Sequence, residues 1–91
     1  MQYTNEKIQN LNKALSEVVK SMRVNKTGLS VNKFGESYGI EKNNILRIEK
    51  AQGYCKLITI WQVANAFGLK FSEFIKYVEE KLGDDFTLID E

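Results

Sequence analysis

Apolar residues recur every three or four positions along most of the chain, which is the spacing of one face of an α-helix. The clearest example lies near the N-terminus, where one apolar stripe is formed by Ile8, Leu11, Leu15, Val18 and Met22. We expect a long first helix here, which Thr4 or Asn5 caps at its start. It should end near residues 23–26, before the helix-breaking Thr27-Gly28 pair.

The second and third predicted helices are short and close together in the sequence. The second begins after Ser30, a favourable N-cap residue, and ends at Tyr38. The third covers about 42–50. Gly39, between them, can adopt a left-handed backbone conformation at little cost and is expected to form the turn.

Two more helices are predicted in the second half, after a loop at 51–56. The fourth is apolar on nearly every side and is therefore expected at the centre of the core; its apolar positions are Leu57, Ile60, Trp61, Ala64 and Phe67. Gly68 should end it. The fifth should run from a cap at Ser72 to Leu82, with Gly83 beyond its end.

The chain contains no proline, and alternation of apolar and polar residues is confined to 86–89, so an all-α fold is predicted. A length of 91 residues allows one small domain. We expect this domain over 1–83, followed by a short acidic tail over 84–91.

Composition narrows the chemistry that this chain can perform. It has no histidine and one cysteine, Cys55, which excludes a disulfide within one chain, a zinc site of the Cys/His type and a Ser-His-Asp or Cys-His catalytic group. Glu79 and Glu80 are adjacent on a helix and diverge, so they are a poor acid/base pair. No glycine-rich phosphate loop is present. We expect no enzyme activity, no cofactor and no metal.

The N-terminus is polar and the sequence has no apolar run of 18 residues, so we expect a cytoplasmic protein without a membrane anchor.

Charge is divided unevenly along the chain. Residues 1–71 carry 11 Lys and Arg against 5 Asp and Glu, a balance of +6, whereas residues 72–91 carry 2 against 7, a balance of −5. This asymmetry favours a body that binds a polyanion and an acidic end. The alternative is that both sets are ordinary solvated surface.

Gly35 is unexpected inside the second helix, where glycine costs about 1 kcal/mol relative to alanine. We infer that the missing Cβ lets the second helix approach the third at their crossing. Apolar packing around this joint would offset the cost, since each buried side chain contributes roughly 1.5–3 kcal/mol. The packing residues are Phe34, Ile40, Ile45 and Ile48.

Residues 31–50 resemble the helix-turn-helix of the phage-repressor and Cro-like (XRE) family. That family has Ala or Gly at the fifth position, Gly at the ninth, and apolar residues at the fourth, eighth, tenth, fifteenth and eighteenth. Counted from Val31, these positions hold Gly35, Gly39, Phe34, Tyr38, Ile40, Ile45 and Ile48. The stretch LITIWQVANAFGLKFSEFI at 57–75 resembles the family's last two helices, and Trp61 matches a core position there. The resemblance implies a compact five-helix bundle of the lambda-repressor-like DNA-binding type.

The same resemblance implies that the third helix lies in the major groove of double-stranded DNA. Base edges would be contacted by Lys42, Asn43, Asn44 and Leu46. Phosphates would be contacted by Lys33, Lys50, Tyr54 and Lys56. Arg47 would either join these or pair with a carboxylate such as Glu36. The alternative for the two asparagines is ordinary polar surface.

The C-terminal third has more apolar residues than a five-helix core closed by Phe71 and Phe74 requires. We favour a homodimer interface with the candidates Ile75, Val78, Leu82 and Phe86, supported by the further apolar residues Tyr77, Leu88 and Ile89. Two-fold symmetry would then place two recognition helices about 34 Å apart. The alternative is a fifth helix folded onto the first, with a frayed tail.

The predicted function is therefore a sequence-specific DNA-binding transcriptional regulator that binds an operator as a homodimer. The alternative is a protein-binding module or an antitoxin that uses the same fold to dock a protein partner. Cys55 is expected to be a tolerated small residue rather than a redox sensor.

Overall fold

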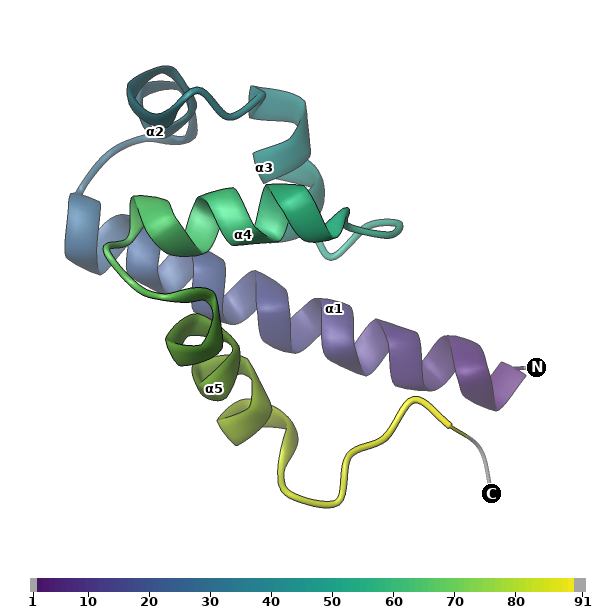
Figure 1. The fold of residues 1–91 in the computed structure, drawn as a ribbon. Helices are drawn as coiled ribbons and strands as arrows, with labels where there is room; N and C mark the ends of the chain where they lie inside the picture. The colour runs from purple at the N-terminus through teal and green to yellow at the C-terminus, as the bar shows by residue number, and fades with distance from the viewer. Residues whose placement is uncertain (1, 90–91) are drawn as a thin grey trace.

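The computed structural model describes the backbone of residues 2–89 and the side chains of residues 6–89. Within these residues it is all-helical, as predicted (Figure 1). The five α-helices are α1 (Gln2–Met22), α2 (Val31–Tyr38), α3 (Lys42–Glu49), α4 (Leu57–Ala66) and α5 (Phe71–Leu82). A single π-helical turn, η1 (Arg23–Thr27), continues α1.

The long helix α1 runs along the molecule, and other helices pack against it (Figure 1). It packs against α3 on one side and α5 on another, while α2 packs against α3 and α4 against α5. The helices enclose one core, formed by Ala14, Leu15, Val18, Val19, Phe34, Ile40, Ile45, Ile48, Val63, Ala64, Phe67, Phe74 and Val78. The molecule measures 42 × 23 × 20 Å, its length being set by α1.

Both ends of α1 differ from the prediction. The helix begins at Gln2, so Thr4 and Asn5 lie inside it rather than before it. At the other end the helical path widens at Arg23 and continues to Thr27. There the Thr27 hydroxyl and the Gly28 N–H both donate to the Arg23 carbonyl, and Gly28 has a left-handed φ of 65°.

Helix α5 begins two residues earlier than a cap at Ser72 would place it. Its N-cap is Lys70 and Ser72 lies in its first turn. The Glu73 carboxylate accepts a hydrogen bond from the Lys70 N–H at 2.8 Å, and this bond ties the start of the helix together. The predicted end holds, since Gly83 follows Leu82 with a positive φ of 91°.

Helix α4 is not buried on every side, and the prediction of a core position for Trp61 is wrong. Val63 and Ala64 face the core, whereas the Trp61 side chain is 49% exposed. The reason is that the helices cover α4 on one side only, so its other apolar residues meet solvent.

The C-terminal third mostly covers the chain's own core. Val78 is only 2% exposed and packs inside, so it does not belong to an exposed apolar surface, and Ile75 and Leu82 lie half-buried against the same core. After α5 the chain has no strand at 86–89 and returns along α1 (Figure 1), where the Lys7 ammonium donates to the Ile89 carbonyl at 2.7 Å. Residues 90 and 91 of the predicted tail lie outside the described residues.

None of the helices in the described part of the chain combines the length and apolar character needed to cross a bilayer.

Candidate nucleic-acid interface

The α2–α3 pair has the geometry predicted for residues 31–50. The Ser30 hydroxyl accepts a hydrogen bond from the Lys33 N–H and caps α2. Gly39 has φ 68° and ψ 33°, a left-handed conformation that turns the chain sharply before α3. The Ile40 N–H then donates to the Gly35 carbonyl at 3.0 Å and closes the turn.

Gly35 is buried at the crossing, and a side chain there would collide with backbone. A Cβ atom on Gly35 would lie 2.6 Å from the Ile40 carbonyl oxygen and 3.3 Å from Cδ1 of Ile45. The predicted close approach is therefore present, and its nearest backbone atom belongs to the turn rather than to α3. Phe34 and Ile45 are fully buried on the two sides of this contact.

A buried ion pair, which sequence reasoning missed, fixes α3 to η1, the turn that continues α1. Arg23 makes two hydrogen bonds to the Glu49 carboxylate, from Nε at 2.6 Å and from Nη2 at 2.9 Å. Its Nη1 donates to the Leu29 carbonyl at 2.7 Å. The Ser16 hydroxyl donates to the Glu49 carbonyl at 2.6 Å. The bonds to Glu49 raise the pKa of Arg23, which burial opposes.

The sequence contained a signal for this pair. Arg23 lies four positions after Val19, and Glu49 lies four positions after Ile45. Val19 and Ile45 are both buried. Two opposite charges at positions spaced for the core indicate a buried pair.

The start of α3 presents polar side chains to solvent. Lys42 and Asn43 are exposed, and Asn44 is half-buried. Among the described residues, neither side-chain amide of Asn43 and Asn44 is engaged in a hydrogen bond, whereas the amides of Asn12 and Asn65 donate to backbone carbonyls. The two amides on α3 thus keep their bonding capacity for an outside molecule. Leu46 is half-buried and exposes less of its side chain to a bound molecule than Lys42 and Asn43 do.

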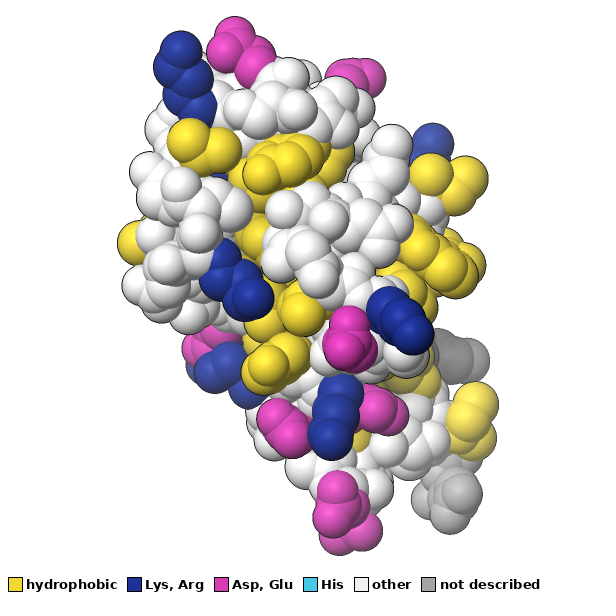
Figure 2. All heavy atoms as spheres, turned by 60° about the vertical axis from the view of Figure 1, so that its left-hand side comes forward, with side chains coloured by type: hydrophobic (Ala, Val, Ile, Leu, Met, Phe, Trp, Pro, Cys, Tyr) yellow, Lys and Arg dark blue, Asp and Glu magenta, His cyan; other side chains and the backbone are white. Residues whose placement is uncertain are grey.

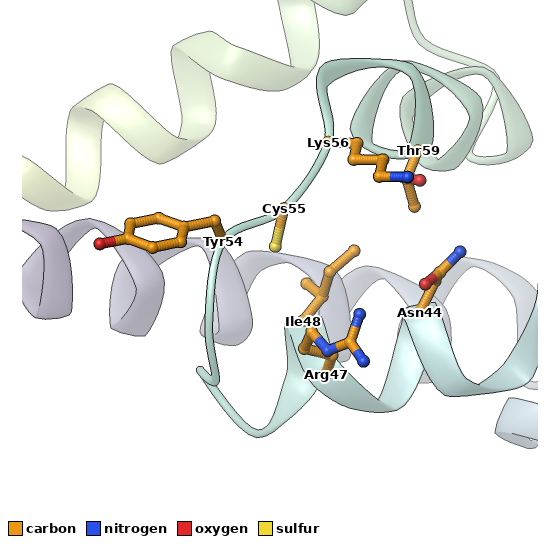
Figure 3. A pocket seen from close by; sticks show the side chains of 7 residues that line it. All are labelled: Asn44, Arg47, Ile48, Tyr54, Cys55, Lys56 and Thr59. Atoms are coloured by element: carbon orange, nitrogen blue, oxygen red, sulfur yellow. The ribbon is translucent and has the colours of Figure 1, made fainter.

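A shallow hollow of about 40 Å³ lies beside this helix (Figure 3). It is lined by Asn44, Arg47, Ile48, Tyr54, Cys55, Lys56 and Thr59. Asn44 and Arg47 lie three positions apart on α3, and Lys56 comes from the loop before α4. The structure thus brings one predicted base-contacting residue together with predicted phosphate-contacting residues. The exposed Tyr54 ring points away from the hollow.

The loop that supplies Tyr54 and Lys56 is held in place from α1. The Asn12 amide donates to the Gly53 carbonyl at 2.8 Å. Ala51, two positions after the last residue of α3, adopts a left-handed φ of 55°. These features fix the path of the loop next to Arg47.

Cys55 lines the hollow with a free, half-buried thiol. Burial raises the pKa of Cys55, and the positive charge of Arg47 partly opposes this shift.

The remaining predicted contacts lie outside the hollow. Lys33 is exposed on α2 and Lys50 is exposed at the end of α3. Of the two predicted alternatives for Arg47, pairing with Glu36 is not seen: the ion pairs among the described residues do not include it. Glu36 and Glu41 are both exposed within the motif and lower its positive potential.

A scan against protein-family models and searches of curated proteins and of solved structures found no match for this chain. The resemblance of residues 31–50 to the phage-repressor and Cro-like family stays a prediction.

Proposed function

We propose that the protein is a sequence-specific DNA-binding regulator whose helix α3 enters the major groove. The observation that carries this proposal is the grouping of Asn44, Arg47 and Lys56 at one hollow, next to the unbonded amide of Asn43. An asparagine amide can pair with adenine N6 and N7, and a guanidinium and an ammonium can hold neighbouring phosphates. The rigid turn at Gly35 and Gly39 orients these groups together.

Phosphates on the other side of the groove would meet helix α2. Its N-terminus lies beside the exposed Lys33, and helix N-termini are favourable positions for phosphate oxygens. Lys50 would extend the contact beyond the end of α3. The described segment after α5, residues 83–89, lies across α1 from α2 and α3, so its two aspartates would be kept away from the DNA (Figure 1).

Binding as a homodimer belongs to the same proposal. Since Val78 is inside the core, the interface would use the surface that remains, namely Phe86 with the exposed Tyr77, Leu88 and Ile89. A two-fold dimer would present two α3 helices to sites about 34 Å apart on the duplex.

The experiment that tests the function is selection of bound sequences from a random duplex pool, followed by titration of the selected duplex. We expect one enriched motif and a steep loss of affinity with salt, with a logarithmic slope near −0.9 for each phosphate contacted. A pool that shows no enrichment after repeated rounds would rule out sequence-specific binding.

A matched pair of variants separates base reading from stability. Asn43→Ala combined with Asn44→Ala should remove about 1–3 kcal/mol of discrimination per lost base contact and leave the melting temperature nearly unchanged. The control is Asn25→Ala, at an exposed asparagine whose amide bonds to Ser21 outside this surface. If discrimination survives the double change, these residues do not read the bases.

A further inference from the structure

Helix α4 presents an apolar face that the described chain leaves largely exposed. Leu57 is 59% exposed, Ile58 is 73% exposed and Trp61 is 49% exposed. Positions 57 and 58 lie four and three residues before 61, so the three side chains are neighbours on one side of the helix. Hydrophobic side chains reach the surface in a broken stripe on the side of the molecule drawn in Figure 2. Grouped exposure of this kind marks interaction sites more often than scattered single residues do.

The indole at the centre of this face is held in one orientation. The Trp61 ring stacks on the Phe71 ring of α5, with centroids 4.6 Å apart and an angle of 14° between the planes. Phe71 itself is half-buried against the core. A tryptophan that is fixed before binding loses little freedom on contact, which is the property of residues that dominate protein interfaces.

Two lysines lie next to residues of this face: Lys56 precedes Leu57, and Lys70 precedes Phe71, whose ring stacks on Trp61. The sequence from Leu57 to Leu69 contains no charged residue, and the exposed Lys56 and Lys70 flank it. The N-terminus of α4 adds a partial positive charge and has no side-chain cap. The nearest carboxylate that follows in the chain, Glu73, is bonded to the Lys70 N–H.

We propose that this face of α4 is a docking site for a segment of a partner protein that carries acidic and apolar side chains together. The apolar side chains would cover Leu57, Ile58 and Trp61, and the carboxylates would pair with Lys56 and Lys70. Charge disfavours a second copy of this chain, because two copies of this face would bring their lysines Lys56 and Lys70 into one interface, and 57–69 supplies no carboxylate to pair with them. Phosphates of a nucleic acid would meet the lysines but leave the three apolar side chains uncovered. The docking site shares Lys56 with the proposed DNA-binding surface, but its apolar contacts do not depend on DNA binding.

The protein carries its own reporter for this contact, since Trp61 is the one tryptophan in the chain. The probe is a synthetic 16-residue peptide with leucine and phenylalanine at helical spacing and glutamate at the other positions. We expect it to shift Trp61 emission to shorter wavelength and to protect the indole from acrylamide, with an affinity that falls as salt is raised. Two control peptides, one with lysine for every glutamate and one with alanine for every apolar residue, should cause no shift.

Two sets of variants locate the site. Ile58→Gln should weaken binding of the glutamate peptide at least tenfold, whereas Val24→Gln, at a residue that is 51% exposed on η1, should not. Lys56→Gln combined with Lys70→Gln should weaken binding severalfold at low salt, whereas Lys20→Gln on α1 should not.

Several outcomes would overturn the proposal. One is an unchanged Trp61 emission at millimolar glutamate peptide, and another is an equal response to the lysine peptide. A shift produced by phosphatidylglycerol vesicles and not by the peptide would assign the face to a membrane surface. Self-association that Ile58→Gln abolishes, measured by analytical ultracentrifugation without peptide, would assign it to a second copy.

Discussion

A single missing side chain decides how the two short helices meet. At position 35 there is room for a hydrogen and not for a Cβ, because the Ile40 carbonyl oxygen would then lie at 2.6 Å. That oxygen belongs to backbone and cannot rotate away as the end of a flexible side chain could. The turn at Gly39 depends on this contact, since the Ile40 N–H is bonded to the Gly35 carbonyl.

Replacing Gly35 by leucine should therefore unfold the domain or nearly so. The added atoms enter a packed core and push against backbone, which costs about 3 kcal/mol or more even though helix propensity improves. Thermal unfolding followed by circular dichroism measures the effect. Ser37→Leu, at an exposed position of the same helix, is the control and should change the melting temperature little. A Gly35→Leu protein that melts like the control would refute the close contact.

The raised pKa of Cys55 gives a second prediction at this scale. Because burial disfavours the thiolate, less of it is present at pH 8 than in the unfolded chain, and alkylation by iodoacetamide should be slower by a factor of roughly two to ten. The native thiol keeps its proton to higher pH, so its contribution to stability is present below the ordinary pKa and is lost as pH rises through the raised one.

The pH profile of the alkylation rate separates this effect from simple shielding. The apparent pKa in the folded protein should exceed that measured in urea, and Arg47→Gln should move it further up, since Arg47 favours the thiolate. If Arg47→Gln leaves the apparent pKa of Cys55 unchanged, the guanidinium does not act on the thiol.

At the scale of elements, the ion pair between η1 and α3 is the contact where one substitution should reduce stability most. The side chains of Arg23 and Glu49 are 11% and 8% exposed, and their pairing satisfies both charges. Arg23→Met should cost about 3 kcal/mol because it leaves the Glu49 carboxylate without its partner. Adding Glu49→Leu should recover much of that loss. The exposed pair of Lys81 and Glu17, 3.8 Å apart, is the control, and Glu17→Gln should cost less than about 0.5 kcal/mol.

Urea unfolding of the four combinations at positions 23 and 49 gives the coupling energy directly. A double variant as unstable as the sum of the singles would mean that the two charges act independently.

How far the sequence predicts these elements depends on whether each has one apolar face. Helices α1, α2 and α3 do, and spacing together with Ser30 and Gly39 predicts where they lie, except that α1 begins at Gln2, before its predicted caps. Helix α4 is apolar on nearly every side, so the spacing of its apolar residues does not tell which side is covered. For this reason the sequence places Trp61 in the core, although its side chain is exposed. Ser72 is a residue type that often caps helices, but the start of α5 is instead closed by the Glu73 carboxylate, which accepts a hydrogen bond from the Lys70 N–H. Residue type alone therefore predicts the start of α5 at the wrong position.

Helical spacing also predicts part of the candidate site. Asn44 and Arg47 share a face of α3 by their spacing alone. Their meeting with Lys56 depends on the left-handed Ala51 and on the bond from Asn12 to Gly53, which are contacts between distant parts of the chain. Local periodicity carries no information about such contacts.

For the whole molecule, the uneven charge of the chain becomes a separation in space. The helices α2 and α3 lie on one side of α1, and the described segment after α5, residues 83–89, lies on the other (Figure 1). Its carboxylates therefore act on a bound polyanion only through long-range repulsion, which salt screens over about 8 Å at physiological ionic strength.

Removing residues 84–91 tests this separation. The deletion takes away four carboxylates and no cation, so the formal net charge rises from +1 to +5. Affinity for the selected duplex should rise about two- to tenfold at low salt and return to that of the full chain at high salt, because only screened repulsion is lost. Asp84→Asn combined with Asp85→Asn keeps the segment in place and should give part of the gain. A fall in affinity that the asparagine variant does not share would instead show that Phe86, Leu88 or Ile89 joins two copies on the duplex.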